Sequence, residues 1–205
     1  MFINFTNLKK TYNMKINGII HIGAHYGEEV SEYISNEISN IILFEPLDEN
    51  FDILLKKIKG FNGNIKCNKV ALGSKRSHAT MFVSSNDKQS SSILKPKSHL
   101  TQYPSITFNS TEIVEVHLLD DYDTQNFNFI NIDVQGYELE VLKGGIKTLE
   151  NIDYIYSEVN RNELYENGVL VEELDEFLYQ YNFRRITTSW VGGTWGDALY
   201  IKQKV

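Results

Sequence analysis

Short apolar runs alternate along this chain with longer amphipathic segments, and this alternation restricts the possible folds more than any other feature of the sequence. Four runs are rich in β-branched and aromatic residues, and each is followed within two residues by Gly, Glu or Asp: residues 18–22, 40–44, 127–132 and 153–156. Runs of this length and composition are typical of the buried strands of a parallel sheet. We expect a further strand at residues 65–70.

Amphipathic segments separate these runs and predict helices. The segments are residues 28–37, 47–59, 137–149 and 171–181. In the second of them, Phe51, Leu54 and Ile58 repeat at helical spacing and form one apolar stripe. The repetition of strand and helix at this spacing predicts right-handed crossovers and an α/β fold in three layers.

Two segments depart from this rhythm. Residues 184–190 and 198–202 resemble strands joined by a Gly-rich turn, so we expect them to pair antiparallel at one edge of the sheet. Residues 84–110 hold most of the serines, and we predict a long mobile loop there, between strands at 80–83 and 111–118. Loops of that length inside a compact domain are usually functional or disordered.

The length and composition limit the class of protein. A chain of 205 residues is about the size of one domain, so we expect a single domain over residues 1–205, with its core at 18–202. Its 41% hydrophobic and 23% charged residues exclude a mainly disordered chain. The net charge of −7 leaves no basic surplus to neutralise phosphates, which disfavours general binding of nucleic acid.

The single cysteine and the hydropathy of the chain predict the cellular compartment of the protein. The single cysteine, Cys67, has no partner for a disulfide or a zinc cluster, which fits a reducing environment. No apolar stretch approaches the ~20 residues that span a bilayer, and the first residues lack the regions of a cleavable signal. We therefore expect a soluble cytoplasmic protein with no membrane span, of open oligomeric state.

The first strand ends in a Gly-bearing loop, residues 23–27 (GAHYG), which is followed by Glu28 and Glu29. In an open parallel sheet the ligand binds outside the carboxyl ends of the strands. A dinucleotide-binding loop would need the pattern GxGxxG, but the middle Gly is absent and the two glutamates would repel a phosphate. The loop is therefore either a site for a ligand with a cationic or amino-acid portion, or a plain tight turn.

Acidic residues follow three other strands. Glu45 either accepts hydrogen bonds from the ribose hydroxyls of an adenosine or is a solvated cap before Pro46. Asp133 either takes part in chemistry or caps the next helix. Glu158 lies on the same sheet edge, and its alternative role is a surface ion pair with Arg161. The histidines beyond residue 30 are expected to be structural or exposed: His78, His99 and His117.

The ordered motifs 20–28 (IHIGAHYGE), 44–46 (FEP), 70–72 (VAL) and 132–138 (IDVQGYE) resemble the FkbM-type family of S-adenosylmethionine-dependent methyltransferases. The resemblance extends over nearly the whole chain. It implies a Rossmann-like class I methyltransferase fold, an α/β three-layer sandwich with a seven-stranded, mostly parallel sheet and one antiparallel edge strand. It also implies S-adenosylmethionine as cofactor and O-methylation, most often of a sugar or polyketide-type hydroxyl.

The resemblance also assigns residues to the cofactor. Carried over by position, they come from the strand ends and from the serine-rich segment 90–94: Gly23, Ala24, His25, Glu45, Ala71, Leu72, Ser91, Ser92, Asp133 and Gln135. Glu45 would bind the ribose, Ala71 and Leu72 would flank the adenine, and the serine-rich segment would close over the cofactor. His21 stands where many members carry an acidic residue, which argues against binding of the cofactor amine through position 21. Gln135 stands where many carry Glu, which lowers the negative charge beside Asp133, so no metal is expected.

A sulfonium methyl is a strong electrophile, so the protein must mainly align an oxygen with the S–CH3 bond and exclude water. A general base contributes less, and we expect Asp133 in this role, with Glu158 second and His25 third. The alternative role of His25 is that of a loop histidine whose imidazole bonds the backbone. The acceptor, a sugar or glycan, is expected beside a group of polar and aromatic residues: Glu158, Asn160, Tyr165, Trp195 and Asp197.

Three other functions stay open: methylation of a non-sugar small-molecule hydroxyl, a nicotinamide-dependent oxidoreductase, and a non-catalytic binding module. The missing middle Gly argues against the oxidoreductase, and the carboxylates Asp133 and Glu158 argue against a silent module. Methylation of nucleic acid is disfavoured because the chain has no Asn-Pro-Pro-aromatic segment for extracting a base.

Overall fold

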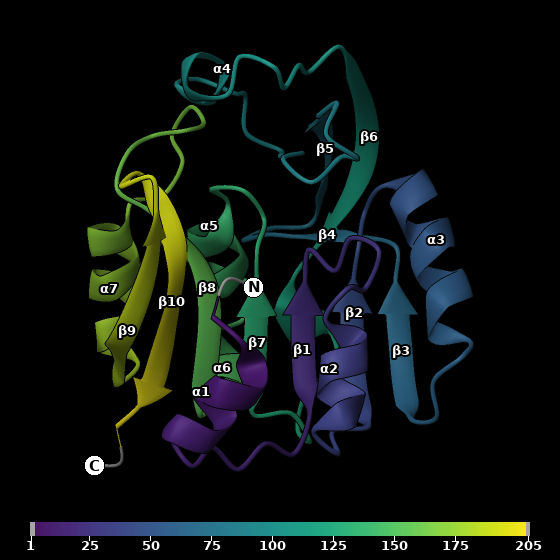
Figure 1. The fold of residues 1–205 in the computed structure, drawn as a ribbon, viewed down its shortest axis with the longest axis vertical. Coiled ribbons are helices and arrows are strands. Elements are labelled where there is room, and N and C mark those ends of the chain that lie inside the picture. Colours follow the sequence, from purple (N-terminus) through teal and green to yellow (C-terminus); the bar gives the residue numbers. More distant parts are fainter. Residues whose placement is uncertain (1–2, 204–205) are drawn as a thin grey trace.

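The computed structural model describes residues 3–203, which form a seven-stranded sheet with helices on both faces (Figure 1). In spatial order its strands are β3 (Asn64–Asn68), β2 (Asn40–Phe44), β1 (Ile19–Ile22), β7 (Phe129–Ile132), β8 (Tyr154–Asn160), β10 (Trp195–Lys202) and β9 (Phe183–Val191). The first five run parallel, and β10 pairs antiparallel with both β8 and β9. The predicted seven-stranded, mostly parallel sheet is confirmed, and the antiparallel strand β10 lies between β8 and the edge strand β9.

Two apolar cores lie on opposite faces of this sheet. Because successive side chains of a strand point to opposite faces, Ile20 belongs to one core and its neighbour Ile19 to the other. One core is covered by α5 (Glu138–Lys143), α6 (Ile146–Leu149) and α7 (Val171–Gln180). The other is covered by α1 (Phe5–Thr11), α2 (Val30–Ser35) and α3 (Asp48–Ile58). The three-layer arrangement is thus confirmed, and no helix within residues 3–203 has the length and apolar character to cross a membrane.

The helix expected over residues 137–149 is in fact two helices. It is interrupted at Gly144, where an added Cβ would lie 2.0 Å from the carbonyl oxygen of Gly73. The expectation of one continuous helix is wrong because this close approach comes from a distant part of the chain. The helix α1 was not predicted, although Phe5 and Leu8 bury one face of it.

A second sheet of three strands stands over the carboxyl ends of the first (Figure 1). Its order is β4 (Ala71–Leu72), β6 (Ser110–His117) and β5 (Ser77–Val83). β5 contains the predicted strand 80–83, and β6 covers all but the last residue of the predicted strand 111–118. The strand expected at 65–70 ends early, at Asn68, because Ala71 already pairs with Val116 of β6.

The segment between β5 and β6 folds back against β5. The Phe82 and Ser92 backbones exchange hydrogen bonds of 2.8 and 3.2 Å, and Ser92 is fully buried. Farther along, this segment forms the short helix α4 (His99–Gln102). These contacts favour an ordered segment rather than the mobile loop expected from the sequence. We call residues 84–94 the serine segment.

Candidate active site

The carboxyl ends of the central strands border a cavity of about 470 Å³, called here the polar cavity. Asp133 follows β7, Glu158 lies in β8 and Asp197 lies in β10, and all three line this cavity. A second, more apolar hollow, the apolar slot, adjoins it and is walled by residues at the ends of β2 and β4. Five residues line both spaces: Gly23, His25, Gln89, Asp133 and Gln135.

The loop after β1 is held in a conformation that glycine favours. Gly23 has φ +78°, and a Cβ there would lie 1.9 Å from the carbonyl oxygen of Asp133, so only glycine permits this approach of the two strand ends. The amides of Gly23 and Ala24 donate to Phe44 O at 3.0 and 2.9 Å, and the amide of His25 donates to Glu45 Oε2 at 2.9 Å. These amides are therefore engaged within the protein, which agrees with the expectation that the loop does not cradle a phosphate.

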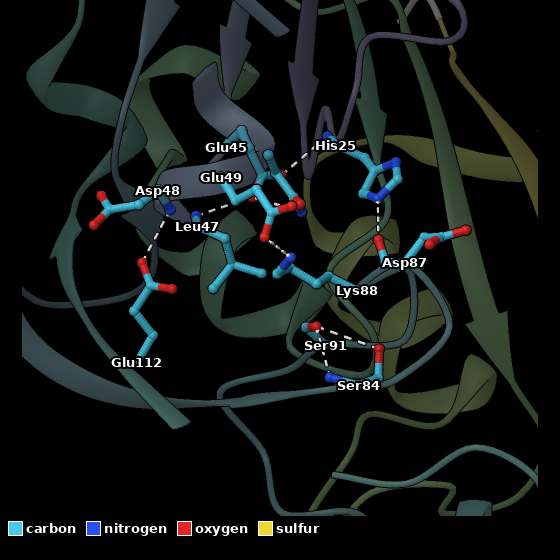
Figure 2. A network of polar contacts seen from close by, with 11 residues as sticks. His25, Glu45, Leu47, Asp48, Glu49, Ser84, Asp87, Lys88, Ser91 and Glu112 are labelled. Carbon is cyan, nitrogen blue, oxygen red and sulfur yellow. Dashed lines mark hydrogen bonds and ion pairs between the residues drawn. The ribbon is translucent and has the colours of Figure 1, made fainter. Parts of the chain in front are cut away.

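Glu45 lines the apolar slot and is only 5% exposed, so it is not a solvated cap. Figure 2 shows its carboxylate bonded to His25 and to Leu47. Its Oε1 accepts hydrogen bonds from Leu47 N at 2.9 Å and from Asn50 Nδ2 at 3.3 Å. Burial raises the pKa of this carboxyl despite these donors. A carboxylate has about four acceptor sites, so Glu45 keeps capacity for a further hydroxyl donor. The buried Oδ1 of Asn50, also at the slot, has no partner within the described residues.

His25 joins the loop to the serine segment. Its Nδ1 lies 2.8 Å from Glu28 Oε1, and its Nε2 lies 2.7 Å from Asp87 O (Figure 2). Burial lowers the pKa of His25, but the hydrogen bonds with Glu28 and Asp87 O outweigh that effect and the net shift is upward. Both ring nitrogens therefore have partners within the protein, which favours the structural role of His25 over that of a general base.

Asp133 and Glu158 form an acid pair bridged by one amide. Gln135 Nε2 lies 2.8 Å from Asp133 Oδ1 and 2.5 Å from Glu158 Oε2 and donates to both. Asp133 is exposed to the cavity, whereas Glu158 is only 2% exposed. Burial, and then the charge of Asp133, hold the pKa of Glu158 well above its usual range. Glu158 therefore keeps its proton to a higher pH than a solvated carboxyl would.

Hydrogen bonds to the Glu138 side chain fix the turn that carries Gln135. Gln135 has φ +56°, and Glu138 Oε1 accepts the amides of Val134 at 3.1 Å and Gly136 at 3.0 Å. Glu138 is fully buried, and burial raises its pKa to about 7. Asp133 does not cap α5: no side-chain hydrogen bond caps this helix, and Glu138, its first residue, holds the turn that precedes it.

Most of the residues expected at the site lie together, and four do not line either hollow. The expected residues Gly23, His25, Asp133 and Gln135 line both spaces. A further four line the apolar slot: Glu45, Ala71, Leu72 and Ser91. The acceptor candidates Glu158, Trp195 and Asp197 line the polar cavity. The other four are buried behind these surfaces: Ala24, Ser92, Asn160 and Tyr165.

Of the two roles expected for His99, structural or exposed, the structure excludes exposure, and Arg161 does not form the ion pair considered for it. His99 is not exposed: it is 3% exposed and lines the polar cavity, with rings of Tyr103 and Tyr165 at 5.1 and 5.5 Å. Arg161 does not pair with Glu158, because its guanidinium stacks 3.8 Å above the Trp190 ring. The sequence pattern could not predict that His99 lines the cavity, because α4 reaches the cavity only through tertiary folding. Residues 3–203 contain no group of three or more His, Cys, Asp or Glu placed to hold a metal.

The sequence has recognisable relatives. Residues 21–185 match the family model described as methyltransferase FkbM domain. The chain is 26% identical over 198 residues to the 2-O-methyltransferase NoeI of Sinorhizobium fredii, an alignment that covers 91% of this chain and 80% of that protein.

Solved structures share the fold at low sequence identity. A crystal structure of methyltransferase FkbM from Methylobacillus flagellatus aligns with a TM-score of 0.63 at 16% identity. The alignment covers 90% of this chain but only 43% of that one, so the present chain spans less than half of its length. Streptococcus pneumoniae Sp1610, a putative tRNA methyltransferase crystallised with S-adenosyl-L-methionine, aligns with a TM-score of 0.56 at 12% identity, over 97% of this chain and 73% of that one. These matches establish the class I methyltransferase fold.

Proposed function

The chain belongs to the FkbM methyltransferase family, and on that premise we propose that it transfers the methyl group of S-adenosylmethionine to a hydroxyl of a sugar or glycan. The observation that carries this proposal is the acid pair Asp133–Glu158 at the polar cavity, directly beside an apolar slot that contains Glu45. The relative named as a 2-O-methyltransferase supports oxygen as the acceptor atom.

The residues of the apolar slot fit the adenosine part of S-adenosylmethionine. Glu45 and the unpartnered Asn50 Oδ1 are acceptors suited to ribose hydroxyls, and Ala71 and Leu72 are small apolar side chains suited to a planar base. Gly23, His25 and Gln135 line the boundary with the polar cavity and are proposed to face the methionine part. Ser91 lines the slot from the serine segment. Ala24 and Ser92 are proposed to support these residues from behind, since neither lines the slot.

The polar cavity fits a sugar by its mixture of polar and aromatic side chains. Carboxylates suit the hydroxyl rim of a sugar, and Tyr103 and Trp195 suit its apolar face. Trp195 Nε1 donates to the Tyr103 hydroxyl at 2.6 Å, which keeps the two aromatic residues together. Glu158, Trp195 and Asp197 are therefore proposed to contact the acceptor, while the buried Asn160 supports the strand end.

When bound, S-adenosylmethionine supplies an electrophilic methyl: an O–CH3 bond forms as the S–CH3 bond breaks, and its electron pair remains on sulfur. Asp133, exposed to the cavity and fixed by Gln135, takes the proton of the acceptor hydroxyl and later releases it to water. Glu158, which keeps a proton through its raised pKa, is suited to donate a hydrogen bond to the acceptor. Holding the hydroxyl in line with the S–CH3 bond lowers the barrier by up to ~7–11 kcal/mol. A general base raises the rate by ~10²–10⁴-fold, which is about 2.7–5.5 kcal/mol and therefore a smaller contribution.

The test is methyl transfer to a panel of defined acceptors. The chain is incubated with methyl-labelled S-adenosylmethionine and methyl glycosides of hexoses, deoxyhexoses and amino sugars, together with non-sugar alcohols and a tRNA. We expect labelled O-methyl sugar, identified by NMR, and formation of S-adenosylhomocysteine in equal amount. Transfer only to non-sugar alcohols or to RNA, or no binding of S-adenosylhomocysteine by calorimetry, contradicts the proposal.

A further inference from the structure

Gln135 connects the acid pair to a buried tyrosine. Its Nε2 donates to Asp133 and Glu158, and its Oε1 lies 2.9 Å from the hydroxyl of Tyr165, which donates to it. A side-chain amide has its donor and its acceptor at opposite ends. A donor at the Oε1 end therefore keeps the Nε2 end turned toward the two carboxylates.

Tyr165 is itself held firmly. Its side chain is 1% exposed, and its single hydroxyl proton is shared between Gln135 Oε1 and the carbonyl oxygen of Ser90 in the serine segment, which lies 2.7 Å from the hydroxyl. Ser92 Oγ donates to the carbonyl oxygen of Gln135 at 2.9 Å, so the backbone of Gln135 is fixed as well. Tyr165 does not line the polar cavity, and its position suits support of Gln135 better than the contact with acceptor expected from the sequence.

We propose that Tyr165 is a positioning residue: it orients the Gln135 amide so that one N–H group stabilises the charge of the Asp133–Glu158 pair. This inference rests on the proposed function for its catalytic meaning, since Asp133 of the pair is the proposed base. Its structural content is independent of any acceptor.

The surroundings of the pair make this N–H group important. Other groups that act on the pair are mostly acidic: Glu138 from α5 and Asp197 from β10 both raise the pKa of Glu158. Three histidines also line the cavity: His21 in β1, His25 in the loop after it and His99 in α4. Burial lowers the pKa of His21 and of His99. Because a hydrogen bond to the charged form lowers the pKa of a carboxyl, losing the Gln135 donor raises the pKa of the pair.

The experiment is Tyr165→Phe with the carboxyl carbons of Asp133 and Glu158 followed by 13C NMR titration, in protein saturated with S-adenosylhomocysteine. We expect the apparent pKa of the pair to rise by roughly half to one unit. The matched control is Tyr200→Phe, because Tyr200 is equally buried and its hydroxyl donates to a different carboxylate, Asp175, at 2.8 Å. In that variant we expect lower thermal stability and unchanged titration of the pair.

A second variant tests the route through the amide. Gln135→Leu is expected to raise the pKa as much as Tyr165→Phe or more, and the double variant is expected to equal Gln135→Leu alone, because both changes remove the same contact. An unshifted titration in folded Tyr165→Phe, or additive shifts in the double variant, overturns the inference. Since no acceptor is needed, a failure to methylate sugars counts against the proposed function and leaves this result intact. Once the panel has given an acceptor, kcat can be measured as a function of pH. In the same variants, the rise of kcat on the acidic side is expected to shift to higher pH.

Discussion

Replacing Asp133 by Asn removes one negative charge from the polar cavity and leaves the shape of the side chain almost unchanged. An Asn oxygen can still accept the hydrogen bond that Gln135 Nε2 donates at 2.8 Å, and the backbone N–H still donates to Ile22 O at 3.1 Å. Because the Asp133 side chain is exposed to the cavity, the change leaves no buried group unpaired. We expect the free energy of unfolding to change by no more than about 0.5 kcal/mol.

The expected effect is on the reaction. If Asp133 takes the hydroxyl proton, its loss lowers kcat by about 10²–10⁴-fold, the contribution of a positioned base, which is about 2.7–5.5 kcal/mol of transition-state stabilisation. The residual rate comes from alignment alone. The assay measures S-adenosylhomocysteine release with the best acceptor of the panel, and calorimetry measures the Kd of S-adenosylhomocysteine, which is expected to change little.

Two variants make this result specific. Asp123→Asn changes an exposed aspartate that precedes β7, at the opposite end of the strand, and is expected to keep wild-type kcat. Glu158→Gln imitates the protonated form that its raised pKa favours, and is expected to lower kcat less than Asp133→Asn does. A kcat within a few-fold of wild type in Asp133→Asn, or a larger loss in Glu158→Gln, refutes the assignment of Asp133 as the base.

Three further perturbations test the cofactor site and its support. Glu45→Gln places an N–H group against the backbone amide of Leu47 or His25, two donors that face each other. Calorimetry should therefore show at least about ten-fold weaker binding of S-adenosylhomocysteine. The control, Glu49→Gln, changes an exposed residue and should leave the Kd unchanged. Gly23→Ala puts a Cβ 1.9 Å from Asp133 O at φ +78°; the backbone strain alone costs about 1–2 kcal/mol, and a Tm equal to wild type would contradict the described loop. The pKa of Glu138 is raised from 4.5 to about 7, so the stability it contributes is fully present below pH 4.5 and is lost as pH rises through 7. Urea unfolding of Glu138→Gln should lack this decline, and an identical pH dependence in both proteins would show that Glu138 is not the cause.

The central sheet and the position of its chemistry were predictable because local patterns determine them. The strands β1, β2, β7 and β8 are buried on both faces, so each is a short apolar run visible without any knowledge of its partners. A parallel sheet gathers the carboxyl ends of such strands at one edge. Gly23, Glu45 and Asp133 could therefore be placed together from their positions after the runs.

The functional details of the site depend on contacts that join distant parts of the chain. Gln135 and Tyr165 meet because the neighbouring strands β7 and β8 end side by side, and His99 reaches the polar cavity because α4 folds over the strand ends. The break at Gly144 likewise comes from the approach of Gly73. Sequence alone determined which strands form and where their polar ends gather, because burial of a strand leaves a local apolar pattern. Tertiary structure decided which side chains touch, because a hydrogen bond between distant residues leaves no periodic trace in either segment.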